Sequence, residues 1–235
     1  MKRLTILAVI ALVLASCGPR AGKNADNGAQ TDSTATETME QKMIQEPEFD
    51  IITSKGTMRV KLYSKTPKHR DNFVKLVKEN YYDGVRFHRV IEGFMIQTGD
   101  PFSRDTTLIN KWGQGGPDYT IPAEFVSEYW HKKGALAAAR KGDMANPRKA
   151  SSGSQFYIVH DPYSCQHLDG QYTVFGEVTE GLDVIDRIAT VATDRYDRPY
   201  EDVMIISIKK VEYPEDKEVI EVVEVEEVKD STATK

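Results

Sequence analysis

Arg89 and His88 are neighbours within residues 87–100, and both have side chains that could carry chemistry. A guanidinium stays protonated and presents five N–H donors in a rigid planar fork, so Arg89 could stabilise an acceptor that gains electron density. An isolated arginine is more often a surface residue with a packed stem, and that alternative stays open. His88 could act as a general base. Because neighbours on a strand face opposite sides, His88 should point away from a groove that Arg89 lines.

A second group of reactive side chains comprises His160, Cys165 and His167. Their spacing fits no closed zinc site, and no fourth ligand is evident. The chain has two cysteines, Cys17 and Cys165, so no framework of internal disulfides is expected. We therefore expect neither a metal nor a cofactor.

Several patterned segments must position these side chains. Residues 49–53 and 57–63 alternate apolar and polar residues around a turn that contains Gly56, which indicates a β-hairpin. Further along, the patterns predict a helix that opens at Thr66-Pro67 with Thr66 as N-cap, a helix over residues 184–192 and a strand over residues 203–211. Many short strands with two helices favour a β-barrel with helical caps over alternating βαβ units.

The charge balance limits the classes of partner. The 235 residues carry a formal net charge of -5, with a pI of about 5.6. A nucleic-acid binder needs Lys and Arg clustered on one face to neutralise phosphates, so we expect no nucleic-acid partner.

The amino-terminal residues indicate export. Met1-Lys2-Arg3 is a positive region, residues 4–14 are apolar, and Leu14-Ala15-Ser16-Cys17 resembles a bacterial lipobox. Lipidated Cys17 would anchor the protein to a membrane of the bacterial cell envelope with its domain outside the cytoplasm. The alternative is an ordinary secretory signal with a chance cysteine. We expect a signal peptide, a lipid-anchored flexible linker, one domain and an acidic tail, over residues 1–16, 17–47, 48–213 and 214–235.

Three segments carry motifs that occur together. Residues 87–100 read Phe-His-Arg-Val-Ile-Glu-Gly-Phe-Met-Ile-Gln-Thr-Gly-Asp, residues 152–158 read Ser-Gly-Ser-Gln-Phe-Tyr-Ile, and residues 168–176 read Leu-Asp-Gly-Gln-Tyr-Thr-Val-Phe-Gly. In type and order they resemble the cyclophilin-type peptidyl-prolyl cis-trans isomerases. The resemblance covers the whole globular region.

This resemblance implies a mainly β fold, a closed eight-stranded antiparallel barrel capped by two α-helices, with the active groove on its outer face. It implies an isomerase of X-Pro bonds in proline-containing segments of other proteins, working as a monomer. Arg89 would be the catalytic side chain, with Gln97 beside it. The implied substrate-binding residues are Phe94, Met95, Ala139, Gln155, Phe156, Tyr157, His167, Leu168 and Tyr172.

Two departures from the usual family pattern are visible. Residues 144–151 look like an insertion near the groove, and His167 and Tyr172 replace a Trp and a frequent His. The alternative function is a cyclophilin-like peptide-binding module or chaperone that does not rely on turnover. Of the expected residues, Phe94, Met95 and Leu168 would be ordinary core residues if the motifs were absent.

Overall fold

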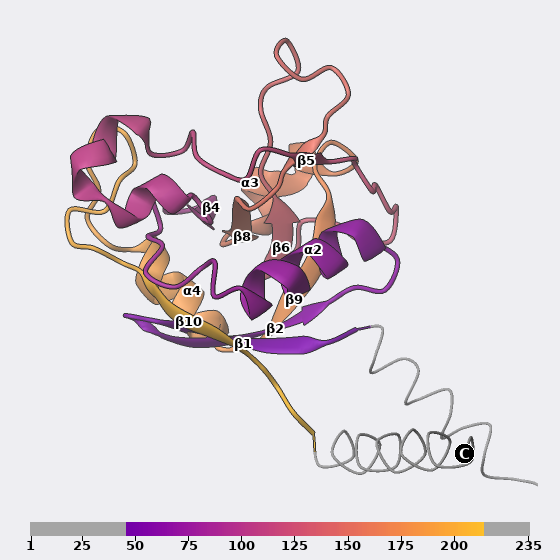
Figure 1. Ribbon diagram of the computed structural model, residues 1–235, viewed down its shortest axis with the longest axis horizontal. Helices are drawn as coiled ribbons and strands as arrows, with labels where there is room; N and C mark the ends of the chain where they lie inside the picture. The colour runs from indigo at the N-terminus through magenta and orange to yellow at the C-terminus, as the bar shows by residue number, and fades with distance from the viewer. Residues whose placement is uncertain (1–45, 214–235) are drawn as a thin grey trace, which may run out of the picture.

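The structure is a computed structural model that describes residues 46–213 (Figure 1). The expected signal peptide, the linker up to residue 45 and the acidic tail lie outside the described residues. No helix within residues 46–213 is long and apolar enough to cross a membrane. The strands are β1 (Glu48–Thr53), β2 (Gly56–Leu62), β3 (Arg89–Ile91), β4 (Met95–Thr98), β5 (Thr120–Ile121), β6 (Ala135–Ala138), β7 (Ser151–Ser152), β8 (Phe156–Val159), β9 (Val174–Glu180) and β10 (Ile205–Lys210). The α-helices are α2 (Pro67–Lys78), α3 (Pro162–Cys165) and α4 (Leu182–Ala189), and the 3-10 helices are η1 (Pro101–Arg104), η2 (Thr106–Lys111) and η3 (Gln166–Leu168).

Eight of these strands form one curled sheet in the order β10-β1-β2-β9-β6-β8-β4-β3, and every pairing is antiparallel. The predicted closed barrel is wrong, because β10 and β3 are edges that do not pair with each other as strands. The residues that precede them meet at a single bridge between Arg86 and Met204 and at a few backbone hydrogen bonds, such as Phe87 N–H to the Val203 carbonyl at 2.8 Å. This contact is too short to be a strand ladder, so the sheet stays open between β10 and β3.

A row of apolar residues crosses the inner face of the sheet. Leu62, Leu136, Ile158, Ile96 and Val90 are linked through successive strand registers, with Gly176 between the first two. All five are buried in the main core. Because successive residues on a strand face opposite sides, the neighbours of this row must face outward.

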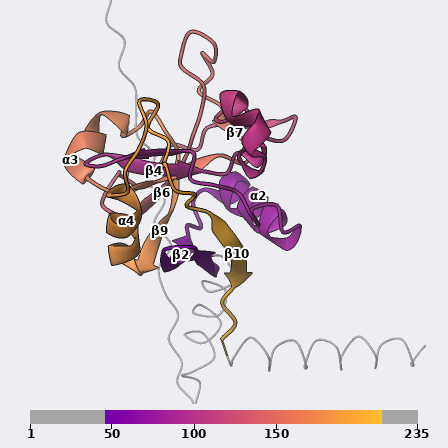
Figure 2. The ribbon, with the colours of Figure 1, turned by 90° about the vertical axis from the view of Figure 1, so that its left-hand side faces the viewer.

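The two predicted helices are present and cover the curled sheet from opposite sides (Figure 2). α4 buries Val184, Ile185, Ile188 and Ala189, as its apolar spacing requires, but ends three residues before the predicted limit at residue 192.

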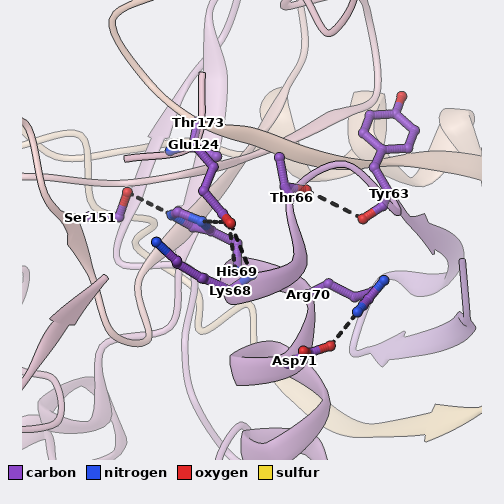
Figure 3. A network of polar contacts seen from close by, with 9 residues as sticks. All are labelled: Tyr63, Thr66, Lys68, His69, Arg70, Asp71, Glu124, Ser151 and Thr173. Atoms are coloured by element: carbon purple, nitrogen blue, oxygen red, sulfur yellow. Dashed lines mark hydrogen bonds and ion pairs between the residues drawn. The ribbon is translucent and has the colours of Figure 1, made fainter. Parts of the chain in front are cut away.

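The start of α2 depends on a distant carboxylate rather than on the predicted cap. Thr66 makes no side-chain capping bond; the Glu124 carboxylate instead accepts the backbone N–H groups of Lys68 and His69 at 3.1 and 3.0 Å (Figure 3). The His69 ring, which is buried, lies 2.7 Å from Glu124 and 2.9 Å from Ser151 Oγ. Although this is a serine, histidine and carboxylate in series, Ser151 is 1% exposed and no substrate could reach it. The series joins α2 to β7 and to the loop before β6.

Candidate functional site

The outer face of the sheet brings three polar or aromatic side chains into one row. Arg89 on β3 is the register partner of Gln97 on β4, which in turn is the partner of Tyr157 on β8. Register partners in an antiparallel sheet lie on the same face, a few ångströms apart. Because each is next in sequence to a member of the inner row, all three face outward. The alternation of side chains between the two faces of each strand therefore assembles the centre of the site.

A cavity of about 110 Å³ lies over this row. Its lining contains most of the predicted site residues together with one that was not predicted, Arg140. The lining residues are Arg89, Phe94, Met95, Gln97, Ala139, Arg140, Tyr157, Leu168 and Tyr172. An apolar cavity of about 150 Å³ can hold a benzene molecule, so this one suits a smaller, five-membered ring.

The Arg89 guanidinium lies at the open side of the cavity, with 44% of its side chain exposed. Its Nε donates to Asp197 at 3.4 Å, which is the one hydrogen bond that the described residues give this side chain. The Asp197 carbonyl accepts the Val90 N–H at 2.7 Å, which fixes the Asp197 loop beside β3. Both Nη atoms are left free to donate to a bound molecule.

Gln97 is oriented from behind by a second amide. Its Nε2 donates to Gln155 Oε1 at 3.1 Å, and Gln155 Nε2 donates to the Gly115 carbonyl at 2.7 Å. Gln155 is buried and lies outside the cavity lining. The structure therefore places Gln155 as the support of Gln97 rather than against the small cavity. The Gln97 carbonyl oxygen has no partner among the described residues and could accept a bond from a substrate.

The inner wall of the cavity is fixed by a hydrogen-bonded chain that sequence reasoning missed. The Asp169 carboxylate accepts from His131 Nδ1 at 2.6 Å, and the Tyr157 hydroxyl donates to His131 Nε2 at 2.8 Å. Burial lowers the pKa of His131 and raises that of Tyr157 well above its ordinary value, and both shifts favour the neutral ring. With Nδ1–H donated to a carboxylate, Nε2 is the acceptor. Tyr157 is thereby held by its hydroxyl as well as by packing.

Comparison with known proteins shows the family of this chain. The family model for the cyclophilin type peptidyl-prolyl cis-trans isomerase/CLD family matches residues 48–210. The chain belongs to the cyclophilin-type peptidyl-prolyl cis-trans isomerase family.

Relatives of this cyclophilin-type chain include single-domain and much longer proteins. Peptidyl-prolyl cis-trans isomerase-like 1 of Homo sapiens is 37% identical over 163 residues, which cover 69% of this chain and 91% of that protein. Peptidyl-prolyl cis-trans isomerase cyp15 of Rhizopus delemar is 36% identical over 181 residues, which cover 77% of this chain. The matched part spans 27% of the length of cyp15 and 23% of the length of peptidyl-prolyl cis-trans isomerase CYP71 of Arabidopsis thaliana.

A solved structure with a similar fold is that of a cyclophilin type peptidyl-prolyl cis-trans isomerase of Cryptosporidium parvum in the presence of the dipeptide Ala-Pro. The two chains are 27% identical, with a TM-score of 0.62, and the match covers 71% of this chain and 99% of the other.

Three predicted site residues of this cyclophilin-type domain do not line the small cavity: Gln155, described above, Phe156 and His167. The Phe156 side chain lies on the inner face of the sheet, where it packs edge-on against Phe73 and Tyr82. Its predicted place in the groove is therefore wrong for its side chain. His167 is exposed and stacks on Phe94, with ring centroids 6.2 Å apart. It therefore lies at the rim, in contact with a lining residue.

Ala139 lines the cavity as predicted, but its backbone is already engaged. Its N–H donates to the Gln155 carbonyl at 3.0 Å, and its carbonyl accepts the Ser152 N–H at 2.8 Å. Ala139 thus offers a substrate its methyl group and, at most, a second lone pair of its carbonyl. The expected backbone contacts from this residue are correspondingly limited.

The residues considered for acid–base or metal chemistry are kept apart. His88 is buried away from the cavity, and burial lowers its pKa to about 4. His160 accepts the Gly93 N–H at 2.9 Å, and the buried Cys165, whose pKa burial raises to about 12, contacts the Phe94 carbonyl. Within residues 46–213 no group of three or more His, Cys, Asp or Glu side chains could hold a metal ion.

A second, larger cavity of about 700 Å³ adjoins the first and shares Gln97, Ala139 and Arg140 with it. Its other walls come from residues 113–120, from the loop between β6 and β7, which projects from the body of the protein (Figure 1), and from Ser152, Gly153 and Gln155. That loop contains the predicted insertion. The predicted substrate-binding residue Gln155 therefore lines this cavity and not the small one.

Proposed function

We propose that this chain accelerates cis-trans isomerisation of X-Pro peptide bonds in other proteins. The observation that carries the proposal is the pair of Arg89 Nη atoms without a partner among the described residues, beside a ring-sized cavity whose lining includes Phe94, Met95 and Leu168. Phe94, Met95 and Leu168 would desolvate the proline ring, and Gln97 would hold the neighbouring backbone.

The chemistry of the reaction explains why an arginine suits this place. Rotation about X-Pro breaks amide resonance, with a barrier of about 18 to 20 kcal/mol. In the twisted state the proline nitrogen regains its lone pair and becomes an acceptor. A donor that bonds to this nitrogen stabilises the twisted state more than the planar one, which is the condition for catalysis. The step needs no proton transfer, which agrees with the burial of His88.

One hydrogen bond does not account for a large acceleration. A charge-assisted bond contributes about 1.5 to 3 kcal/mol, and each 1.36 kcal/mol is a factor of about ten in rate. Arg89 alone would therefore give between about tenfold and about 150-fold. The rest must come from ring desolvation and from Gln97, which Gln155 holds in place.

The test is isomerisation of a short X-Pro peptide by the full chain, followed by NMR exchange spectroscopy. We expect the exchange between cis and trans peptide to accelerate in proportion to protein concentration. A protein that binds the peptide without accelerating exchange would instead be the alternative, a peptide-binding module or chaperone.

We further propose that the protein is a lipoprotein of the bacterial cell envelope that acts on exported proteins. This part rests on residues 1–17 alone, where a positive start and an apolar run lead into Leu14-Ala15-Ser16-Cys17. Residues 17–47 would then be the tether and residues 48–213 the catalytic domain, working as a monomer outside the cytoplasm.

A further inference from the structure

Arg140 is a second arginine at the site, and the proposed isomerisation step does not use it. It lies on the wall shared by the small cavity and the larger one. Consecutive Cα atoms are about 3.8 Å apart, so a residue one or two positions from a proline in the small cavity would come within reach of the larger cavity. Arg140 lies where the two cavities adjoin.

The guanidinium of Arg140 is held rigidly by three of its contacts. It stacks on the Tyr172 ring at 4.3 Å, its Nε donates to the Gln171 carbonyl at 2.9 Å, and its Nη1 donates to Asp143 at 2.5 Å. The side chain is 4% exposed. An arginine that is already immobile loses little conformational entropy when it binds a further acceptor.

One nitrogen of this guanidinium is left over. Within residues 46–213, Nη2 of Arg140 makes no hydrogen bond. It is also not among the buried side-chain atoms that lack a partner in this range, which are Arg86 Nε and the two ring nitrogens of His88. Nη2 is therefore reachable from open space, and the space that Arg140 lines is that of the two cavities.

The lining of the larger cavity contains two cationic residues, Arg140 and Lys141, and no Asp or Glu. Asp143, which pairs with Arg140 through Nη1 and offsets part of its charge, lies outside both linings. An incoming carboxylate would therefore meet Lys141 and Nη2 of Arg140 with no carboxylate among the lining residues.

We propose that Arg140 selects proline segments that carry an acidic side chain one or two residues from the proline. The carboxylate accepts a charge-assisted hydrogen bond from Nη2 while the proline ring occupies the small cavity. This inference rests on the proposed isomerase function, because it assumes that the small cavity receives the proline.

The experiment uses the full chain and matched peptides in which Glu or Gln stands one or two residues to either side of a single proline. Both kcat/KM and the dissociation constant are measured for each peptide. At the best position we expect Glu to exceed Gln by about tenfold, the effect of one charge-assisted hydrogen bond. In Arg140→Gln the ratio should fall close to one. Arg140→Lys, which keeps the charge without the fork, should retain only part of it.

Arg148→Gln is the matched control, because Arg148 is an exposed arginine on the same loop and lies outside both linings. Its ratio should equal that of the wild type. The proposal is overturned by a wild type without acidic preference at any position, by a preference that survives in Arg140→Gln, or by an equal loss in Arg148→Gln. Acidic preference in binding without turnover of any peptide would refute the isomerase function alone.

Discussion

The Arg89 side chain is partly exposed, and its Nε is held by Asp197. The side chain lies on the face opposite the inner row, and within residues 46–213 its one hydrogen bond is that of Nε to Asp197. Replacement should therefore change chemistry rather than folding, since substitutions outside packed positions usually alter stability little.

We predict that Arg89→Ala lowers kcat/KM for an X-Pro peptide by about a hundredfold, as the loss of one or two charge-assisted donors requires. The melting temperature should stay within a few degrees of the wild type. Arg89→Lys should recover only part of the activity, because a lysine lacks the planar fork. Wild-type turnover in the alanine variant would remove Arg89 from the mechanism.

His88 gives a prediction for pH. Burial lowers its pKa to about 4 in the folded protein, whereas an exposed histidine has a pKa of about 6.5. Between about pH 6.5 and pH 4, His88 is protonated in the unfolded chain but not in the folded protein. The free energy of unfolding therefore decreases as the pH is lowered through this range. The contribution is roughly 3 kcal/mol. His88→Phe should weaken the fall, measured by urea unfolding at pH 4 and pH 7.

Turnover should by contrast be nearly flat from about pH 6 to pH 8, because the guanidinium, the amides and the apolar side chains of the site do not titrate there. A bell-shaped profile centred near neutrality would point to proton transfer and contradict the torsional mechanism.

At the scale of the elements, the end of β4 depends on one close approach. Gly99 has φ of +89°, and a Cβ at this position would overlap the Ser154 carbonyl oxygen and lie 2.8 Å from Gln155 Cα. The close approach of Gly99 to Ser154 and Gln155 places Gln155 where its side chain can accept the hydrogen bond from Gln97. Only a glycine lets the two chain segments approach in this way.

We predict that Gly99→Ala lowers the free energy of unfolding by more than about 2 kcal/mol and also lowers activity, because both backbone strain and a clash are introduced. Gly93→Ala is the matched control. Its φ is +74° but no atom lies within 4 Å of its added Cβ, so it should cost about 1 kcal/mol. Equal losses in the two variants, measured by chemical unfolding, would show that the approach to Ser154 is unimportant.

At the scale of the whole molecule, the proposed anchor and the described domain are separate parts of the chain. We predict that the wild-type protein fractionates with membranes and that Cys17→Ser moves it to the soluble fraction or stalls its processing. Activity per molecule should be unchanged, because the cavity is built from residues 89–172. Incorporation of labelled lipid into the serine variant would contradict the anchor.

The sequence by itself determined the family, the hairpin, both main helices and the outward-facing residues Arg89, Gln97 and Tyr157. These follow from motifs and from alternation along single strands, which are local properties. The three-dimensional structure alone decided how the sheet ends: as an open edge rather than a closed barrel. It also turned Gln155 into a support, placed Phe156 in the core, brought Asp169 and His131 behind Tyr157, and put Arg140 between the two cavities. Those outcomes depend on register shifts and on loops that meet across the sheet, and no pattern along one segment specifies which distant backbone or side chain it will meet.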